Sequence, residues 1–253
     1  MWLTIGKFLN NIARSGARPD IVNMQLITNE TPETQFPSAE TASEEGLVAV
    51  GGEITPVRVL SAYRQGIFPW YSEDQPVLWW SPEPRAIIYP GQIKISRSLR
   101  KTLRKGLFRV TADQAFSEVI KGCSGPRRNS PEGGTWITPD MMKTYIQLHQ
   151  WGYGHSIEVW MEDRLVGGLY GIALGSAFFG ESMFSRVADA SKIALVYLSR
   201  YAESHNIDLI DCQLPTEHLT SMGAINITRK QYLSLLKKSL QHKELSQHWK
   251  LEE

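Results

Sequence analysis

The 253-residue sequence is poor in cysteine and contains no long apolar run. Its two cysteines, Cys123 and Cys212, lie far apart, which excludes a disulfide framework and a four-cysteine zinc site and fits a reducing cytoplasm. No apolar run approaches the roughly 18 residues that a transmembrane helix needs, so we expect neither a membrane span nor a membrane partner. A chain of this length can bury a core large enough to fold without disulfides or a structural metal.

A large excess of charge of one sign is also lacking. The chain has 27 Lys and Arg residues against 26 Asp and Glu residues, and its net charge of +1 argues against a strongly basic nucleic-acid-binding protein. What the sequence does have is tryptophan, with eight residues beside nine Tyr and eight Phe. So many large rings indicate either a heavily aromatic core or a site that stacks on a flat ligand.

One segment departs from this balance. Residues 94–109 contain seven Lys or Arg residues and no acid, so a net of +1 for the whole chain leaves −6 outside the segment. Ser96 can cap a helix over 97–105 on which Leu99 and Leu103 share one face. Five cations occupy the rest of that helix: Arg97, Arg100, Lys101, Arg104 and Lys105. We favour contact with a phosphate backbone over a merely solvated face.

Residues 1–24 are expected to be an N-terminal extension outside the folded part. The stretch carries no acid before Asp20 and is too short and too polar for a secretory signal. It is either a disordered tail or sequence translated upstream of a native start at Met24, and the choice between Met1 and Met24 stays open.

A small N-terminal domain is expected over 25–87. Within it, Thr55 and Pro56 match the cap and first-turn preferences of a helix that Gly66 ends. Residues 67–90 hold five prolines and three tryptophans. This composition excludes a regular helix and predicts an extended, aromatic-lined connector that closes the domain.

The remainder, 88–253, alternates between helical and strand-like patterns and is expected to form a second domain. Expected helices lie at 97–105, 113–121, 138–151, 190–203 and 229–240, and expected strands at 155–161, 165–173, 176–182 and 207–212. Short turns join the first three strands, which predicts an antiparallel meander. The whole is an α+β pattern in which helices pack on a mixed sheet.

Five motifs then point to one family. In chain order they are GLVAVGG at 46–52, YRQGIFPW at 63–70, GTWIT at 134–138, GESMFSR at 180–186 and LIDCQ at 209–213. In this order and spacing they resemble the bacterial leucyl/phenylalanyl-tRNA–protein transferase family. The similarity extends from about residue 36 to about residue 235.

The resemblance implies an aminoacyltransferase. Its donors would be Leu-tRNA and Phe-tRNA, with Met a further candidate, and its acceptors would be proteins with an N-terminal Arg or Lys, which the transfer marks for N-degron degradation. It also implies a C-terminal domain like the GNAT acyltransferases. No metal or diffusible cofactor is expected, since the aminoacyl ester is already activated. We expect a cytoplasmic monomer.

The candidate catalytic residues are Asp211 and Gln213. They are two apart on an expected strand, so their side chains would share one face. Asp211 could accept a hydrogen bond from the Gln213 amide, matching roles proposed in the family, while Gln213 positions the incoming amine because a neutral amide barely accepts a proton. Asp211 or a ribose hydroxyl of the tRNA would help the proton leave. The alternative is a buried Asp that is paired at a strand end.

Glu181 is the candidate partner for a substrate cation. It follows an apolar strand and a glycine, and the alternative role is a salt bridge with Arg186. Four apolar residues near the same strand ends are expected to line a pocket for the transferred Leu or Phe side chain: Leu169, Phe178, Phe179 and Ile210. Ordinary core packing is the alternative and is favoured for at least half of them.

The aromatic candidates for substrate binding lie in or near the same motifs. Trp70 and Trp136 are expected to stack on the terminal adenine of the tRNA, since base–aromatic stacking contributes roughly 1–3 kcal/mol per base. Tyr63 and Tyr145 are expected to line the same area. For a lone tryptophan, core packing would be the default, and the resemblance is what favours stacking here.

Three other functions compete with this interpretation. An acetyl-CoA-dependent acetyltransferase would need a glycine-rich pyrophosphate loop, which residues 185–192 do not provide. A thiol hydrolase would use Cys212 with His218 or His155, but Cys212 is expected to point into the core, where thiols are inert. A non-catalytic tRNA-binding module would bind charged tRNA without forming a product.

Overall fold

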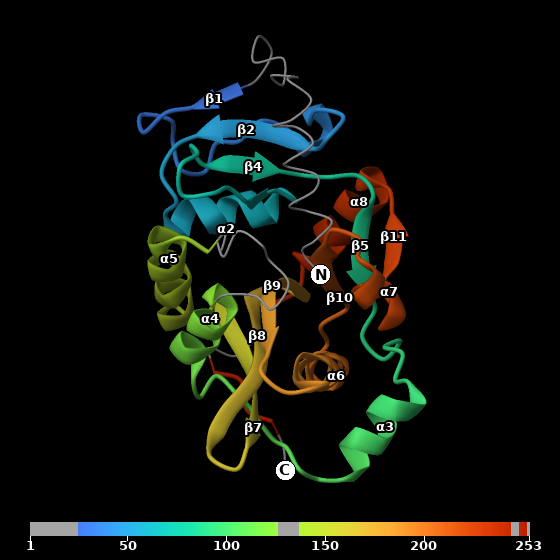
Figure 1. The fold of residues 1–253 in the computed structure, drawn as a ribbon. Coiled ribbons are helices and arrows are strands. Elements are labelled where there is room, and N and C mark those ends of the chain that lie inside the picture. The colour runs from blue at the N-terminus through green and yellow to red at the C-terminus, as the bar shows by residue number, and fades with distance from the viewer. Residues whose placement is uncertain (1–24, 126–136, 244–247, 252–253) are drawn as a thin grey trace.

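The computed structural model describes residues 25–125, 137–243 and 248–251. They form two sheets, with a small one at the top of Figure 1 and a large one below it. Helix α2 (Pro56–Arg64) lies under the small sheet, facing the large one. As expected, the Thr55 hydroxyl caps α2 by accepting from the Arg58 N–H, and Pro56 occupies its first turn.

The small sheet has four strands in the order β1-β2-β4-β3. Their bounds are β1 (Gln25–Ile27), β2 (Leu47–Gly51), β3 (Phe68–Pro69) and β4 (Leu78–Trp80). A 3-10 helix, η2 (Ala39–Thr41), precedes β2. The expectation that 67–90 is extended rather than helical is confirmed, but its role as a connector is wrong, because β3, β4 and β5 of the next sheet fall inside it. Pro69 is tolerated because β3 is an edge strand, where a missing N–H costs no ladder bond.

The large sheet has seven strands in the order β11-β5-β10-β9-β8-β7-β6. The bounds are β5 (Arg85–Ile88), β6 (Arg109–Ala112), β7 (Gly154–Met161), β8 (Arg164–Leu174), β9 (Ala177–Ser185), β10 (Leu209–Gln213) and β11 (Ile225–Ile227). The β7–β8–β9 meander is confirmed, and only β9 and β10 pair in parallel within this sheet as described. The α+β class with a mixed sheet is confirmed. The division expected after residue 87 falls inside β5, and two separate domains stay a prediction.

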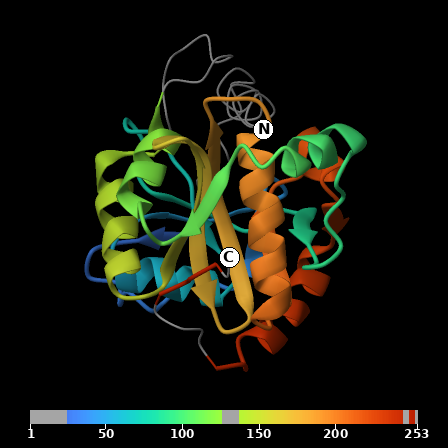
Figure 2. The same ribbon diagram turned by 90° about the horizontal axis from the view of Figure 1, so that it is seen from below.

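Helices cover both faces of the large sheet (Figure 2). They are α3 (Arg97–Arg104), α4 (Phe116–Ser124), α5 (Pro139–Gln150), α6 (Ala190–Ser204), α7 (Glu217–Ser221) and α8 (Arg229–Ser239). The five expected helices of this part are confirmed, while α7, β6 and β11 were not expected. Among the described helices, none combines the length and apolarity needed to cross a bilayer.

The large sheet separates two cores because side chains alternate along a strand. On β9, Phe179 contacts the ring of Tyr63 from α2 at a centroid distance of 4.7 Å, whereas its neighbour Phe178 belongs to the core that holds α6. The face toward α2, α5 and α8 carries most of the buried polar groups of the candidate site.

The chain returns to the α6 side after α8. Trp249 is 1% exposed and its ring stacks on His155 at 4.2 Å and on Tyr201 at 4.4 Å. Its backbone N–H donates to Asp113 at 2.8 Å. Trp249 is therefore part of the core, although the motifs shared with the family end before it.

Candidate active site

Strand β10 ends in a β-bulge. Asp211 lies opposite Ile87 of β5, but the next pair is Gln213 with Ala86, so Cys212 is the extra residue. Gln213 adopts a left-handed backbone conformation with φ of +57°. The bulge and the left-handed turn interrupt the regular strand after Cys212, so a shared face for Asp211 and Gln213 no longer follows from strand alternation and stays a prediction.

Four donors surround the fully buried Asp211 carboxylate. Oδ1 accepts from Arg85 Nε and from the Gln213 backbone N–H, both at 2.9 Å. Oδ2 accepts from Arg85 Nη2 at 2.6 Å and from the Tyr232 hydroxyl at 2.8 Å. A carboxylate has about four lone-pair positions, so no accepting position is left for an incoming amine. The bond to Gln213 comes from its backbone rather than its side chain, and the alternative of a paired, buried Asp is confirmed.

Arg85 is the cation in this network and was missed in the sequence. Its guanidinium lies over the rings of Phe68 and Tyr232, at 4.9 and 4.3 Å, and Nη1 donates to the Gly66 carbonyl at 3.4 Å. Burial, the largest single effect, would lower the pKa of Arg85, but the Asp211 carboxylate together with Tyr232 and Tyr63 outweighs it and holds the pKa above its usual value. The sequence feature that could have identified Arg85 is its place directly before the apolar run Ala86 to Ile88.

Glu181 lies at a second bulge, on β9. Gly180 pairs with Gly171 and Ser182 with Tyr170, so Glu181 is the extra residue. Its carboxylate accepts a hydrogen bond from the Tyr63 hydroxyl, which lies 3.1 Å from the hydroxyl of Tyr145. Tyr63 of α2 and Tyr145 of α5, both predicted site residues, therefore lie beside Glu181, which is a third.

Glu181 is 6% exposed, and burial raises its pKa to about 7, with the tyrosine hydrogen bonds opposing the rise. The same burial raises the pKa of Tyr63 and of Tyr145 well above the usual range. The alternative salt bridge with Arg186 is wrong, because the Arg186 guanidinium donates to the Leu165 carbonyl at 3.0 Å.

The two bulges lie side by side. Phe179 of β9 and Asp211 of β10 are the last parallel pair, and Glu181 and Gln213 each follow two residues later. Bulges interrupt pairing and re-aim side chains, and they are over-represented beside active sites. The structure thus brings Glu181, Tyr63, Tyr145 and the Asp211 network to one end of two neighbouring strands.

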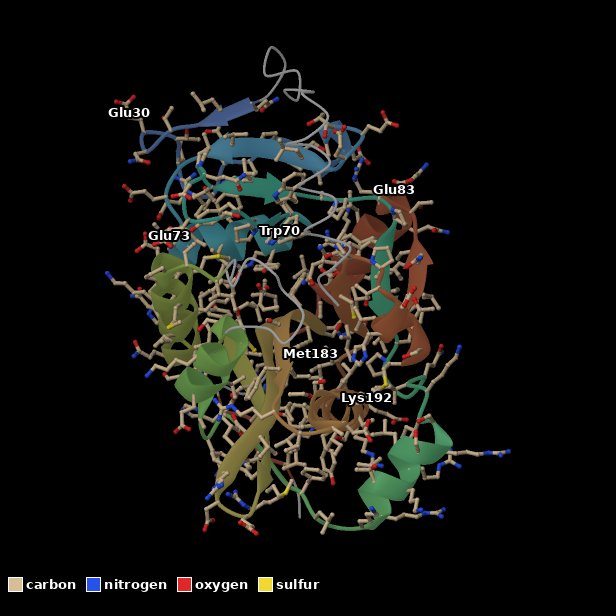
Figure 3. The ribbon with its side chains drawn as sticks, viewed as in Figure 1. Glu30, Trp70, Glu73, Glu83, Met183 and Lys192 are labelled. Carbon is tan, nitrogen blue, oxygen red and sulfur yellow. The ribbon has the colours of Figure 1, made fainter. Side chains whose placement is uncertain are left out.

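Three of the four predicted pocket residues lie on the opposite face of the sheet, whereas the fourth, Phe179, contacts Tyr63 on the face of the candidate site. Leu169, Phe178 and Ile210 line a small apolar cavity of ≈ 30 Å³ together with Met183 of β9 and Leu195 of α6. Benzene occupies an engineered cavity of about 150 Å³, so this space cannot hold a phenylalanine side chain without widening. Met183, which Figure 3 shows in the middle of the molecule, is the most adaptable of the five side chains.

Comparison with known proteins identifies the family. A family model described as "Leucyl/phenylalanyl-tRNA protein transferase" matches residues 87–237, and the model of the N-terminal domain of the same family matches residues 52–83. The chain belongs to the leucyl/phenylalanyl-tRNA protein transferase family.

Relatives in this family span most of the chain. A leucyl/phenylalanyl-tRNA–protein transferase from Azoarcus sp. (strain BH72) is 54% identical over 82% of this chain and 88% of its own length. One from Legionella pneumophila (strain Corby) is 54% identical over 86% of this chain and 96% of its own. Among solved structures, a GCN5-related N-acetyltransferase from Kribbella flavida matches 67% of this chain and 60% of its own with a TM-score of 0.37 and 10% identity.

Of the two tryptophans that the transferase resemblance singled out, Trp136 lies outside the described residues. Trp70 is buried beneath the small sheet (Figure 3), with its ring 6.0 Å from that of Trp80. Its indole N–H is buried and finds no acceptor among the described residues. An unpartnered buried donor is unusual.

The basic helix forms where it was expected. The Ser96 hydroxyl caps α3, Leu99 is buried, and all five predicted cations are exposed. The Thr102 hydroxyl donates to Asp189 at 3.1 Å and so ties α3 to the start of α6. Figure 1 places α3 at the end of the molecule opposite the small sheet, so its cations are far from Trp70.

The surroundings of the Cys212 thiol argue against a thiol hydrolase. Cys212 borders the apolar cavity, and burial raises the pKa of its thiol. His155 is held on the α6 side of the molecule by Asp113, at 2.8 Å, and by the ring of Trp249. A buried thiol with a raised pKa is a poor nucleophile.

Proposed function

We propose that the protein transfers leucine or phenylalanine from aminoacyl-tRNA to the α-amino group of an N-terminal Arg or Lys of an acceptor protein. The observation that supports it is the match of residues 52–83 and 87–237 to one transferase family. Methionine is a further candidate donor residue. The transfer takes place in the cytoplasm, by a monomer, and marks the acceptor for degradation.

The reaction is aminolysis of an ester. The acceptor amine attacks the carbonyl carbon and a tetrahedral oxyanion forms. The ester C–O bond then breaks, and the ribose oxygen leaves as a hydroxyl with the proton that the amine gives up. An α-amino group has a pKa of about 8 in peptides, so a useful neutral fraction exists near pH 7. Positioning therefore carries most of the rate, because it turns a two-body reaction into an effectively intramolecular one.

Different residues of the site position the amine and bind the acceptor cation. Gln213, held in its left-handed turn, orients the incoming amine, and Asp211 holds that turn. Glu181 binds the cation of the acceptor, which favours the ionised form of a carboxyl whose pKa is about 7. The hydroxyls of Tyr63 and Tyr145 orient that carboxylate.

Other residues hold the donor, the aminoacyl-tRNA. Trp70 and Trp136 stack on the terminal adenine, and Leu169, Phe178 and Ile210 widen to receive the transferred side chain. The exposed cations of α3 contact the phosphate backbone of the tRNA: Arg97, Arg100, Lys101, Arg104 and Lys105.

Mixing Phe-tRNA with a peptide that begins with Arg is expected to give a peptide extended by one N-terminal Phe, detected by mass spectrometry. A peptide that begins with Ala is the control for the acceptor, and Gln213→Ala is expected to lower the rate by about 100-fold, the cost of misplacing a reactant by about 1 Å. Binding of Phe-tRNA without product would indicate a tRNA-binding module. Product formed only from acetyl-CoA would indicate an acetyltransferase.

Reversing two charges on α3, in the double variant Arg100→Glu/Arg104→Glu, is expected to weaken tRNA binding and flatten its salt dependence. Each lost phosphate contact lowers the slope of log K against log salt by about 0.7–0.9. The double variant Lys237→Glu/Lys238→Glu reverses two exposed charges on α8 and is the matched control. Equal slopes in the two double variants, measured by filter binding, would contradict a role of α3.

A further inference from the structure

The turn at Gln213 needs support from outside its own strand. A non-glycine residue at φ of +57° is disfavoured, so the conformation persists only where the surroundings fix it. Two hydrogen bonds close the turn: Gln213 N–H to Asp211 Oδ1 at 2.9 Å, and Leu214 N–H to the Cys212 carbonyl at 2.7 Å. The first of them depends on where the Asp211 carboxylate points.

The carboxylate of Asp211 is oriented by two other elements. Arg85 of β5 binds both oxygens through Nε and Nη2, and such paired bonds fix the plane of a carboxylate. Tyr232 of α8 donates to Oδ2 at 2.8 Å and also lies 3.2 Å from Arg85 Nη2. The three side chains are essentially unexposed, so water cannot replace any of these bonds.

Arg85 is in turn held by the layer under the small sheet. Its Nη1 donates to the carbonyl of Gly66, directly after α2, and its guanidinium lies over Phe68 of β3. The turn at Gln213 is therefore connected through Arg85 to the segment that also carries Tyr63 and Trp70.

We propose that Arg85 and Tyr232 are positioning residues for aminoacyl transfer, which clamp Asp211 so that it holds the backbone of Gln213 in the turn that the reaction needs. The inference rests on the proposed function. In this arrangement the Asp211 carboxylate fixes the backbone of Gln213 and does not accept a proton, since its four accepting positions are filled.

Two conservative replacements test the clamp. Tyr232→Phe removes one hydroxyl, and Arg85→Lys keeps the charge but cannot form the paired bonds. Each is expected to lower kcat for Phe transfer by about 10–100-fold, the scale on which misplacement by about 1 Å acts, with KM for Phe-tRNA unchanged. Tyr201→Phe, which removes a hydroxyl from a buried ring on the α6 side, is the matched control with unchanged kcat.

A third variant separates positioning from structural support. In Arg85→Met/Asp211→Leu an apolar pair replaces the ion pair, a change that often leaves stability intact. The proposal expects a melting temperature close to that of the unaltered protein with kcat still lowered. Unchanged kcat in both conservative variants, or full transfer by the double variant, would overturn it. Failure of the unaltered protein to form product would instead refute the proposed function.

Discussion

Glu181→Gln is expected to stabilise the protein at pH 8 by about 3 kcal/mol. The pKa of Glu181 is raised from 4.5 to about 7 in the folded protein, chiefly by burial. Between these two values the folded state binds a proton that the unfolded state has released, so the contribution of Glu181 to stability is greatest below pH 4.5 and is lost as the pH rises through 7. One pKa unit corresponds to about 1.4 kcal/mol, which gives the size of the effect.

Urea unfolding at pH 5 and pH 8 measures the effect of Glu181→Gln on stability. The free energy of unfolding of the unaltered protein should fall more between these pH values than that of Glu181→Gln, because a neutral amide has no proton to lose. Glu158, whose pKa burial also raises, is present in both proteins and cancels in the comparison. Glu203→Gln removes an exposed carboxylate and should follow the unaltered protein. Parallel falls in all three proteins would contradict a protonated Glu181.

The same variant is expected to raise KM for the Arg peptide, because it removes the anion proposed to bind the acceptor. A replacement that stabilises the protein and impairs its activity is typical of a functional site, where the native residue is retained at a cost in stability. Glu181 would then be a group that the fold tolerates rather than one that holds it together.

Trp249→Ala is expected to lower the free energy of unfolding by about 3–5 kcal/mol, the usual cost of truncating a buried Phe or Trp. The side chain is 1% exposed and fills the space between His155 and Tyr201. Its removal creates a cavity and abolishes three ring contacts, of which the third is with Phe178 at 5.5 Å.

Urea unfolding at one pH measures this effect, and Trp151→Ala is the matched control. Trp151 is 42% exposed, so its truncation should cost much less. Equal losses in the two variants would show that the segment 248–251 adds little to the core.

Local signals predicted much of the fold. Caps such as Thr55 and Thr138 mark helices α2 and α5, because a cap bonds only to residues three positions away. The meander was equally visible, since period-two alternation and short turns lie within one stretch of sequence. Strands β5 and β11 were missed because their pairing partners lie far away in the chain.

The sequence indicated candidate site residues, whose roles stay predictions, but not the geometry around them. A shared face for Asp211 and Gln213 follows from alternation only if β10 is regular, and the bulge depends on pairing with β5. Arg186 is near Glu181 in sequence, yet the actual partner, Tyr63, is 118 residues away. Arg85 carries no motif of its own, and its role follows only from the fold that buries it beside Asp211.

The anchoring of Trp249 also bears on how the protein is made. Its bond to Asp113 closes over 136 residues, so the core beside α6 cannot be completed until residue 249 has been synthesised. Translation proceeds at about 5–20 residues per second, and during that interval His155, Phe178 and Tyr201 face water. A nascent chain stalled between α8 and Trp249 would expose an aromatic surface of the kind that chaperones bind, so residues 248–251 must be present before this half of the core can close.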